Sequence, residues 1–164
     1  MNIYVNDAYI PYLNDTTRTQ IFFGGSSSGK SFFLAQRVVM DVLKGHNYLI
    51  VRNVANTIKR SVYNQIVKTI IDLNLSEVFQ MSKSEMVINC KRNNRQIIFG
   101  GLDDPEKLKS ITPIDGVITD IWIEEATETA REAYKQLTKR LRGATPDGIG
   151  KRVIFSFNPI LQTH

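Results

Sequence analysis

Residues 24–31 have the types and spacing needed to hold a triphosphate. They fit the pattern Gly-x-x-x-x-Gly-Lys-Ser, in which small residues let backbone N–H groups surround phosphate oxygens and the lysine adds a positive charge. Lys30 would reach the β- and γ-phosphates, and the Ser31 hydroxyl would bind Mg²⁺. The expected ATP-binding residues of this loop are Gly24, Gly25, Ser26, Ser27, Ser28, Gly29, Lys30 and Ser31.

The flanking residues predict the elements that such a loop requires. Residues 20–23 form a short apolar run typical of a buried strand, and residues 31–43 carry apolar side chains at helical spacing. A strand, a glycine-rich loop and a helix N-terminus in this order aim the helix dipole at the bound phosphates. A chance match in a Gly/Ser turn is the alternative, but it does not explain why both flanks are correct.

Two adjacent acids, Glu124 and Glu125, follow an apolar run at residues 118–123. Hydrolysis of a triphosphate requires an acidic anchor for Mg²⁺ and an acceptor that orients the attacking water. Both groups are expected at the C-terminal end of a parallel strand near the loop. We assign Glu124 to the metal and Glu125, with Lys30, to catalysis, and the order of the two glutamates stays open. Alternatively, the acids simply begin the next helix.

Four further polar residues are candidates for contacts with the nucleotide. Ser156 and Asn158 end an apolar strand expected at residues 152–159 and could face the γ-phosphate, although polar residues often simply terminate a strand. Arg18 and Gln20 stand just before the first core strand, where Arg can stack on an adenine and Gln can hydrogen-bond its edge. A solvated pair at a strand end explains Arg18 and Gln20 equally well.

The order of the apolar segments predicts an α/β fold, in which a mostly parallel central sheet is flanked by helices. Residues 86–90 and 96–99 predict an inserted β-hairpin with a cationic turn at 91–95. A short helix is expected after Asp104, and Thr129 with Glu132 predicts the capped start of another. The other expected elements are strands at residues 48–51 and 118–123 and helices at 56–73 and about 129–143.

Composition sets few limits beyond these. The 164 residues suffice for one domain, and a hydrophobic content of 42% is ordinary for a globular protein. The single cysteine, Cys90, excludes an internal disulfide, and no signal peptide or long apolar span predicts export or membrane insertion. The net charge of +5 is a mild bias towards polyanions such as DNA. The hairpin turn is a candidate DNA contact, although such tips are commonly only solvated.

Three stretches, in this order, resemble the ATPase part of the large terminase subunit of tailed bacteriophages. They are residues 24–31, Trp122-Ile123-Glu124-Glu125-Ala126 and Phe157-Asn158-Pro159, and the likeness runs from about residue 18 to the end. The resemblance implies a P-loop NTPase of the additional-strand, catalytic-glutamate type, in which another core strand separates the glutamate strand from the phosphate-loop strand. It also implies an ATP hydrolase that uses Mg²⁺ to drive double-stranded DNA into a procapsid.

The same resemblance implies a working assembly in the host cytoplasm. Such motors act as a homo-oligomeric ring docked on the portal protein, with a small terminase subunit selecting the DNA. Large terminases normally continue into a nuclease domain, so residues 1–164 are expected to be a single ATPase domain and an N-terminal fragment. Many relatives carry an arginine within the phosphate loop, which this chain lacks. The candidates for an arginine acting on a neighbouring subunit's nucleotide are Arg52, Arg60, Arg140 and Arg142.

Three other functions stay open on the residues alone. A small-molecule kinase would need an acceptor pocket and an arginine-rich lid, neither of which is clear. A helicase- or recombinase-like DNA ATPase would share the same motifs. A nucleotide-gated interaction module would bind ATP with little turnover, which describes an isolated fragment fairly.

Overall fold

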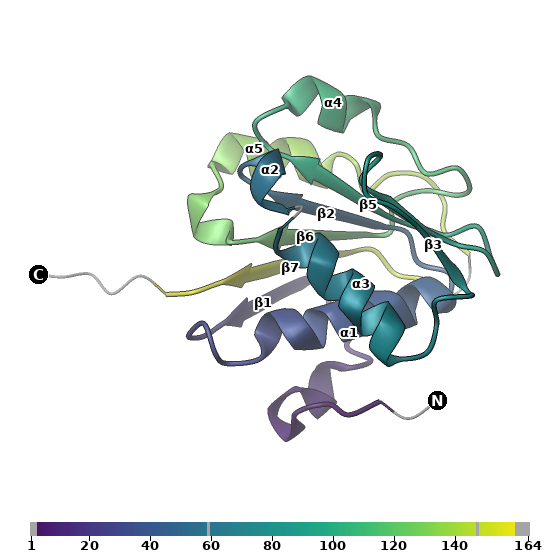
Figure 1. The fold of residues 1–164 in the computed structure, drawn as a ribbon. Coiled ribbons are helices and arrows are strands. Elements are labelled where there is room, and N and C mark those ends of the chain that lie inside the picture. Colours follow the sequence, from purple (N-terminus) through teal and green to yellow (C-terminus); the bar gives the residue numbers. More distant parts are fainter. Residues whose placement is uncertain (1–2, 59, 147, 160–164) are drawn as a thin grey trace, which may run out of the picture.

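The computed structural model describes residues 3–58, 60–146 and 148–159, which form one sheet with helices on both faces (Figure 1). The strands are β1 (Thr19–Phe23), β2 (Tyr48–Arg52), β3 (Phe79–Ser82), β4 (Val87–Cys90), β5 (Gln96–Gly101), β6 (Asp120–Glu124) and β7 (Arg152–Phe157). They lie in the order β1-β7-β6-β2-β5-β4-β3. The five strands from β1 to β5 in this order are parallel, and β4 and β3 extend the sheet in antiparallel fashion. Strand β7 therefore separates β6 from β1, which confirms the predicted strand order.

The helices divide between the two faces of the sheet. They are the 3-10 helix η1 (Asp7–Tyr12), α1 (Lys30–Leu43), α2 (Ala55–Ile58), α3 (Val62–Asp72), α4 (Pro105–Ser110), the 3-10 turn η2 (Ala126–Glu128) and α5 (Arg131–Thr138). Helices α1 and α3 pack on one face, and α4 and α5 lie over the other (Figure 1). In the described ranges, no helix combines the length and the apolar character that spanning a membrane would require.

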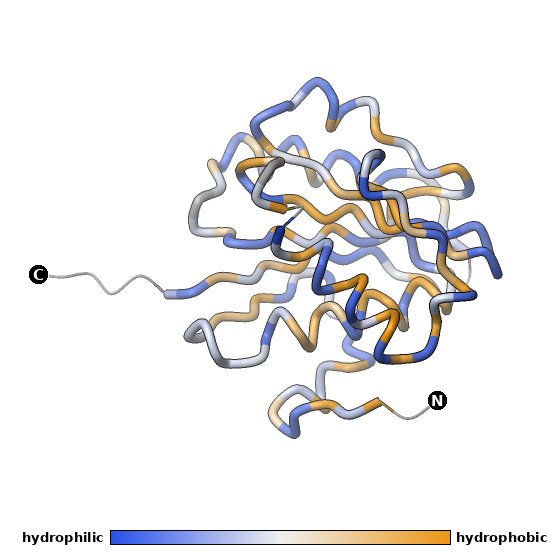
Figure 2. Tube along the Cα trace, in the orientation of Figure 1, coloured by the Kyte–Doolittle hydropathy of each residue, from blue (hydrophilic) through white to orange (hydrophobic). Residues whose placement is uncertain are grey.

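Strand β2 shows why the central strands read as continuous apolar runs. Its residues Tyr48–Val51 are fully buried, because helices cover both faces and parallel strands flank it on each side. Successive side chains point to opposite faces, so Tyr48 and Ile50 join the core beneath α1 and α3. Leu49 and Val51 join the second core, beneath α4 and α5. The same concentration of hydrophobic residues in the central strands is visible in Figure 2.

Two helices differ from the prediction. The single helix expected at residues 56–73 is interrupted, because Ser61 has a non-helical backbone (φ −103°, ψ −94°) and its hydroxyl donates to the Thr57 carbonyl at 3.0 Å. Ser and Thr side chains that bond to nearby backbone groups compete with the helical ladder. The predicted cap of α5 is also wrong. Ala130 is its N-cap, and the Thr129 hydroxyl is buried without a hydrogen-bond partner in the described part of the chain.

The hairpin prediction is confirmed by the antiparallel pairing of β4 with β5. Its second strand also belongs to the parallel core, because β5 pairs with β2 on its other side. Strand β3 was not predicted, since four residues are too few to establish an alternating pattern. The short helix α4 begins as expected, with the Asp104 side chain accepting from the backbone N–H of Lys107 at 3.0 Å.

A buried cluster of charged side chains lies at the N-terminal ends of the central strands, opposite the phosphate loop. Arg152 donates to Asp120 from Nε and to Asp41 Oδ2 from Nη2, the latter at 2.6 Å. The Tyr48 hydroxyl donates to the same Asp41 oxygen at 2.7 Å, and His46 Nδ1 lies 2.6 Å from Asp120 Oδ2. The cluster therefore ties α1 to strands β2, β6 and β7.

We expect Tyr48→Phe to remove part of the alkaline loss of stability. Burial, and then the charges of Asp120 and Asp41, raise the pKa of Tyr48 well above its usual value of 10.0. Above about pH 10 the unfolded chain releases this proton and the folded chain keeps it, so the free energy of unfolding falls by about 1.4 kcal/mol per pH unit. The free energy of unfolding can be measured by urea unfolding at several alkaline pH values. Plotted against pH, it should fall less steeply in Tyr48→Phe than in wild type, by this amount per pH unit. The exposed control Tyr4→Phe should keep the wild-type slope, and an equal slope in both variants would contradict the prediction.

Candidate nucleotide site

The phosphate loop connects β1 to the first turn of α1. Gly29 has φ +79°, a left-handed backbone conformation that glycine adopts without steric cost. The N–H of Phe33 donates to the Gly29 carbonyl at 2.9 Å and closes the first helical turn. The N–H groups of Lys30, Ser31 and Phe32 therefore precede the helical ladder. Such first-turn N–H groups bind phosphate oxygens at helix N-termini.

The ammonium group of Lys30 is held inside the loop. Its Nζ donates to the carbonyls of Gly24 at 3.1 Å and Gly25 at 3.3 Å, and to Oδ1 of Asn158 at 2.5 Å. Only 5% of Lys30 is exposed, so these neutral oxygens compensate a buried charge. Phosphate oxygens would bind the same ammonium more strongly, because they are themselves charged. The structure thus places a positive charge where the β- and γ-phosphates are expected.

The second glutamate is connected to the loop lysine through one side chain. Asn158 Nδ2 donates to Glu125 Oε1 at 3.4 Å, while Asn158 Oδ1 accepts from Lys30. Glu125 has φ +52° and ψ +51°, a left-handed conformation that is uncommon outside glycine. Unusual backbone conformations of this kind concentrate at functional sites. The structure therefore brings Glu125 to the phosphate loop, and its catalytic role stays a prediction.

The first glutamate occupies the last position of β6 and lies against an arginine. Glu124 is buried, and its Oε2 is 3.5 Å from Nε of Arg52, the last residue of the neighbouring strand β2. Arg52 also donates from Nη1 to the Ser61 hydroxyl at 3.4 Å. Arg52 is one of the candidates for an arginine that acts on a neighbouring subunit's nucleotide. In the structure it lies beside Glu124 of its own chain.

Ser156 lies in β7 and Asn158 directly follows that strand, but the two side chains are used differently. The Ser156 hydroxyl is buried and accepts a hydrogen bond from Trp122 Nε1 at 2.8 Å. This bond joins β7 to β6 beneath the site. Of the two residues, only Asn158 has a side chain that contacts the phosphate loop, so the structure does not support the direct γ-phosphate contact predicted for Ser156.

Arg18 directly precedes β1 and Gln20 is the second residue of that strand, whereas the phosphate loop follows its C-terminal end. The adenine contact of Arg18 stays a prediction. Gln20 is buried, and its Nε2 donates to the carbonyls of Asp15 at 3.0 Å and Thr17 at 2.8 Å. Its Oε1 accepts from Arg37 of α1 at 2.5 Å. Gln20 therefore fastens the N-terminal segment to α1, and this is a correction to the sequence prediction.

Tyr9 is a loop contact that sequence reasoning missed. Its hydroxyl donates to the Ser28 carbonyl at 3.0 Å, and its ring stacks on Phe33 with centroids 4.7 Å apart. The Ser28 hydroxyl itself is buried without a hydrogen-bond partner among the described residues. No motif marks an aromatic residue 19 positions before Ser28, because the contact depends on how η1 packs against α1.

The side chains present fit a magnesium ion that is bound together with a nucleotide. Among the described residues, no group of three or more His, Cys, Asp or Glu side chains is placed to hold a metal ion. Mg²⁺ in nucleotide sites keeps several waters and uses one or two protein groups plus phosphate oxygens. The Ser31 hydroxyl, at the start of α1, and the Glu124 carboxylate, at the end of β6, are the candidate protein groups.

The phosphate loop lies between the core strand β1 and helix α1, and the glutamate pair lies at the end of β6, two places from β1 in the sheet. This arrangement defines a P-loop NTPase. The model of the phage terminase large subunit family matches residues 16–164, and the chain belongs to that family. It is 27% identical to the terminase large subunit of Bacillus phage SPP1, over 94% of this chain. It is 32% identical to the PBSX phage terminase large subunit of Bacillus subtilis (strain 168), over 84% of this chain.

Solved structures show the same fold. The large terminase from a thermophilic bacteriophage matches 90% of this chain with a TM-score of 0.69 and 16% identity. The same thermophilic phage protein in complex with ATP-gamma-S matches 90% with a TM-score of 0.62 and 18% identity. The chain covers 35% and 34% of those two structures. It spans 39% of the length of the SPP1 protein and 31% of the PBSX protein.

Proposed function

We propose that this chain hydrolyses ATP with Mg²⁺ and that the hydrolysis drives the packaging of double-stranded DNA. The observation that carries the proposal is the contact path from Lys30 through Asn158 to Glu125. A loop lysine alone would indicate nucleotide binding. A carboxylate connected to that lysine adds the group needed to orient the attacking water. The chain's place in the phage terminase large subunit family supports DNA packaging as the process that uses the energy.

Each residue of the site has a task in this proposal. The backbone N–H groups of residues 24–31 hold the phosphates, and Lys30 neutralises charge on the transferring phosphoryl group. Ser31 and Glu124 would hold Mg²⁺, which neutralises further phosphate charge when bound. Glu125 accepts a hydrogen bond from the attacking water and orients its oxygen towards the γ-phosphorus. The new P–O bond forms as the bond to the β-phosphate oxygen breaks, and the products are ADP and inorganic phosphate.

Asn158 is proposed to report whether the γ-phosphate is present. Its amide contacts Lys30 on one side and Glu125 on the other. A movement of the Lys30 ammonium towards phosphate would weaken its bond to Asn158 Oδ1 and free the amide to reorient. Asn158 lies directly after β7, so this change would be passed to the segment that follows the strand.

We propose that the working form is a homo-oligomeric ring, with the portal protein and the small terminase subunit as partners at the procapsid in the host cytoplasm. The chain would be the ATPase domain, with the nuclease domain outside residues 1–164. Arg60 is the arginine that we retain for action on a neighbouring subunit's nucleotide. It is exposed, whereas Arg52 pairs with Glu124 and Arg140 donates to backbone carbonyls. Arg142 is also exposed, but we set it aside for this role because it lines a cationic cavity on the other side of α5 from Glu125 in sequence.

We expect release of inorganic phosphate from ATP to require Mg²⁺. Chelation with EDTA should stop the release, because the phosphate charge is then uncompensated, and excess Mg²⁺ should restore it. A colorimetric phosphate assay under multiple-turnover conditions measures both states. Transfer of phosphate to an added acceptor instead of water would indicate a kinase. A single turnover without further release would indicate a nucleotide-gated interaction module, and either result would overturn the proposal.

The link to packaging requires a separate measurement. The full-length protein that contains this chain, mixed with procapsids and linear double-stranded DNA, should protect the DNA from added nuclease only when ATP is present. ATP-dependent unwinding of the duplex, without protection, would support a helicase-like ATPase in its place.

A further inference from the structure

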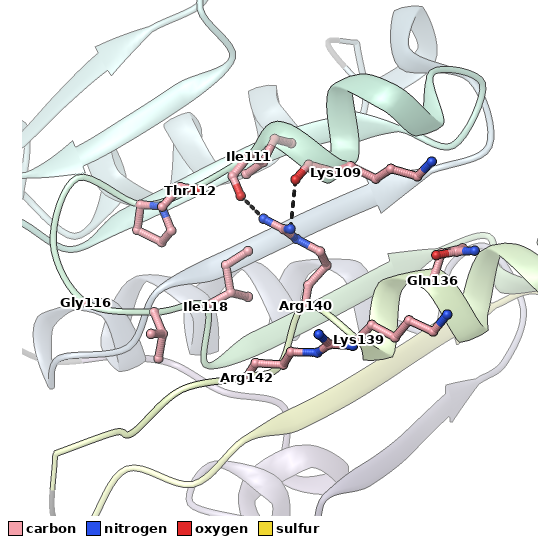
Figure 3. A pocket seen from close by; sticks show the side chains of 11 residues that line it. Lys109, Ile111, Thr112, Gly116, Ile118, Gln136, Lys139, Arg140 and Arg142 are labelled. Carbon is pink, nitrogen blue, oxygen red and sulfur yellow. Dashed lines mark hydrogen bonds between the residues drawn. The ribbon is translucent and has the colours of Figure 1, made fainter.

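A cavity lined by cations lies on the face of the sheet that carries α4 and α5. It has a volume of about 380 Å³ and is bounded by the end of α4, the segment 111–118 and the C-terminal end of α5 (Figure 3). Four of its described lining residues are cationic, and none is Asp or Glu: Lys109, Lys139, Arg140 and Arg142. A hollow with this one-sided charge attracts anions, because its positive charges are not offset by lining acids.

Arg140 links the two helices that form the walls of the cavity. Its Nη1 donates to the Lys109 carbonyl at 2.8 Å, and its Nη2 donates to the Ile111 carbonyl. Figure 3 shows this guanidinium reaching from the end of α5 to the end of α4. Arg140 therefore fixes the distance between the two helices and holds the cavity open.

Lys139 and Arg142 are the cations available to a ligand. Both are exposed, and in the described part of the chain no carboxylate lies within ion-pair distance of either. Lys109, in contrast, is paired with Glu106 at 2.6 Å. Cations near the end of a helix are also favoured by its dipole alone. That explanation does not account for four cations around one cavity that no acid lines.

The cavity is connected to the nucleotide site by two elements. Ile118 lines the cavity just before β6, and Glu124 ends this strand at the nucleotide site. Helix α5 starts shortly after Glu125 and ends directly before Lys139. Its eight residues span about 12 Å. A movement of Glu125 during turnover would therefore reach Lys139 and Arg142 through η2 and α5.

We propose that this cavity, with Lys139 and Arg142, holds phosphates of the double-stranded DNA backbone. The inference rests on the proposed packaging function and assigns the surface that the DNA contacts. Backbone phosphates fit better than a single small anion, because Lys139 and Arg142 are exposed at the rim and Arg140 is occupied by carbonyls. Phosphate contacts carry no sequence information, which suits a motor that must move any sequence.

The test compares two charge-matched double variants of this chain. The first is Lys139→Gln with Arg142→Gln. The second is Lys91→Gln with Arg92→Gln, in the exposed turn between β4 and β5, the surface that the sequence had suggested for DNA. Each removes one lysine and one arginine, so the change in net charge is the same. Fluorescence anisotropy of a labelled duplex of about 30 base pairs, at salt from about 50 mM to about 200 mM, measures the binding.

The cavity variant should bind the duplex at least about tenfold more weakly than wild type, and its log–log salt slope should be smaller by about two. The turn variant should stay within about threefold of wild type, and both should keep wild-type ATP hydrolysis and thermal unfolding. The assignment would be overturned if both variants lost DNA affinity equally, or if the turn variant lost more. It would also be overturned if the cavity variant lost affinity for polyglutamate but not for DNA. A wild-type chain that hydrolyses ATP but does not bind DNA would overturn it as well, and would leave the ATP hydrolase proposal standing.

Discussion

Glu125→Gln is expected to lower steady-state phosphate release by about 10³-fold while ATP still binds. The amide has the size of the original side chain and keeps an oxygen that can accept from Asn158, which now donates at 3.4 Å. It is a far weaker acceptor for a proton of the attacking water, so the loss falls on turnover. The phosphate contacts made by Lys30 and the loop backbone are unchanged by the substitution.

Two measurements on two variants give this prediction its control. Phosphate release reports turnover, and a fluorescent ATP analogue reports binding. Glu124→Gln removes the same charge one residue earlier and should raise the Mg²⁺ concentration needed for half-maximal rate, because Glu124 is assigned to the metal. If Glu124→Gln instead lost turnover and Glu125→Gln instead needed more Mg²⁺, the roles of the two glutamates would be exchanged. Near-normal release in both variants would overturn the assignment of the two glutamates to catalysis and to the metal.

Arg152→Leu should lower the free energy of unfolding by about 3–5 kcal/mol, the cost of leaving buried charges without their partner. Arg152 is 4% exposed, and it contacts Asp120 and Asp41, which are 0% and 3% exposed. Burial alone would lower the pKa of Arg152, but Tyr48 and the two carboxylates together raise it above its usual value, so the guanidinium stays charged. Without it, Asp41 and Asp120 lose the cation that bridges them. Asp41 keeps the Tyr48 hydroxyl and Arg37 at 3.7 Å, and Asp120 keeps His46.

Urea unfolding at neutral pH measures the loss. The matched control is Arg131→Leu in the first turn of α5, where the arginine is exposed and unfolding should change by less than about 0.5 kcal/mol. A triple variant, Arg152→Leu with Asp120→Asn and Asp41→Asn, removes the stranded charges and should recover part of the loss. A loss below about 1 kcal/mol in Arg152→Leu would show that the cluster is not a stabilising contact of the core.

Much of the site could be predicted because its signals are local. The glycines and serines before Lys30 are dictated by backbone geometry around phosphates, and the apolar runs on either side are dictated by burial. The acids at 124 and 125 follow a buried strand, so their position at one edge of a parallel sheet could be expected. The helix break at Ser61 was missed, since a local side-chain bond outweighs the apolar spacing there.

The residues misjudged are those whose partners are distant in the chain. From the sequence alone, Gln20 could be interpreted as a contact to the adenine base. Its partner Arg37 is brought to it only when α1 packs beside β1. Ser156 could read as a phosphate contact until Trp122 of the adjacent strand is placed against it. Arg52 could read as free to act on a neighbour until β2 lies beside β6.

The sequence by itself determined the phosphate loop and the glutamate pair, because each depends on residues within about ten positions of one another. It also determined the α/β class, because each strand and helix has its own local apolar pattern and their order along the chain can be read directly. The tertiary structure decided which side chains meet: Lys30 with Asn158 across 128 positions, Asn158 with Glu125, and Arg140 with the end of α4. These contacts depend on the order of the strands in the sheet. That order is set by how both faces of the sheet are buried together, and no short stretch of sequence encodes it.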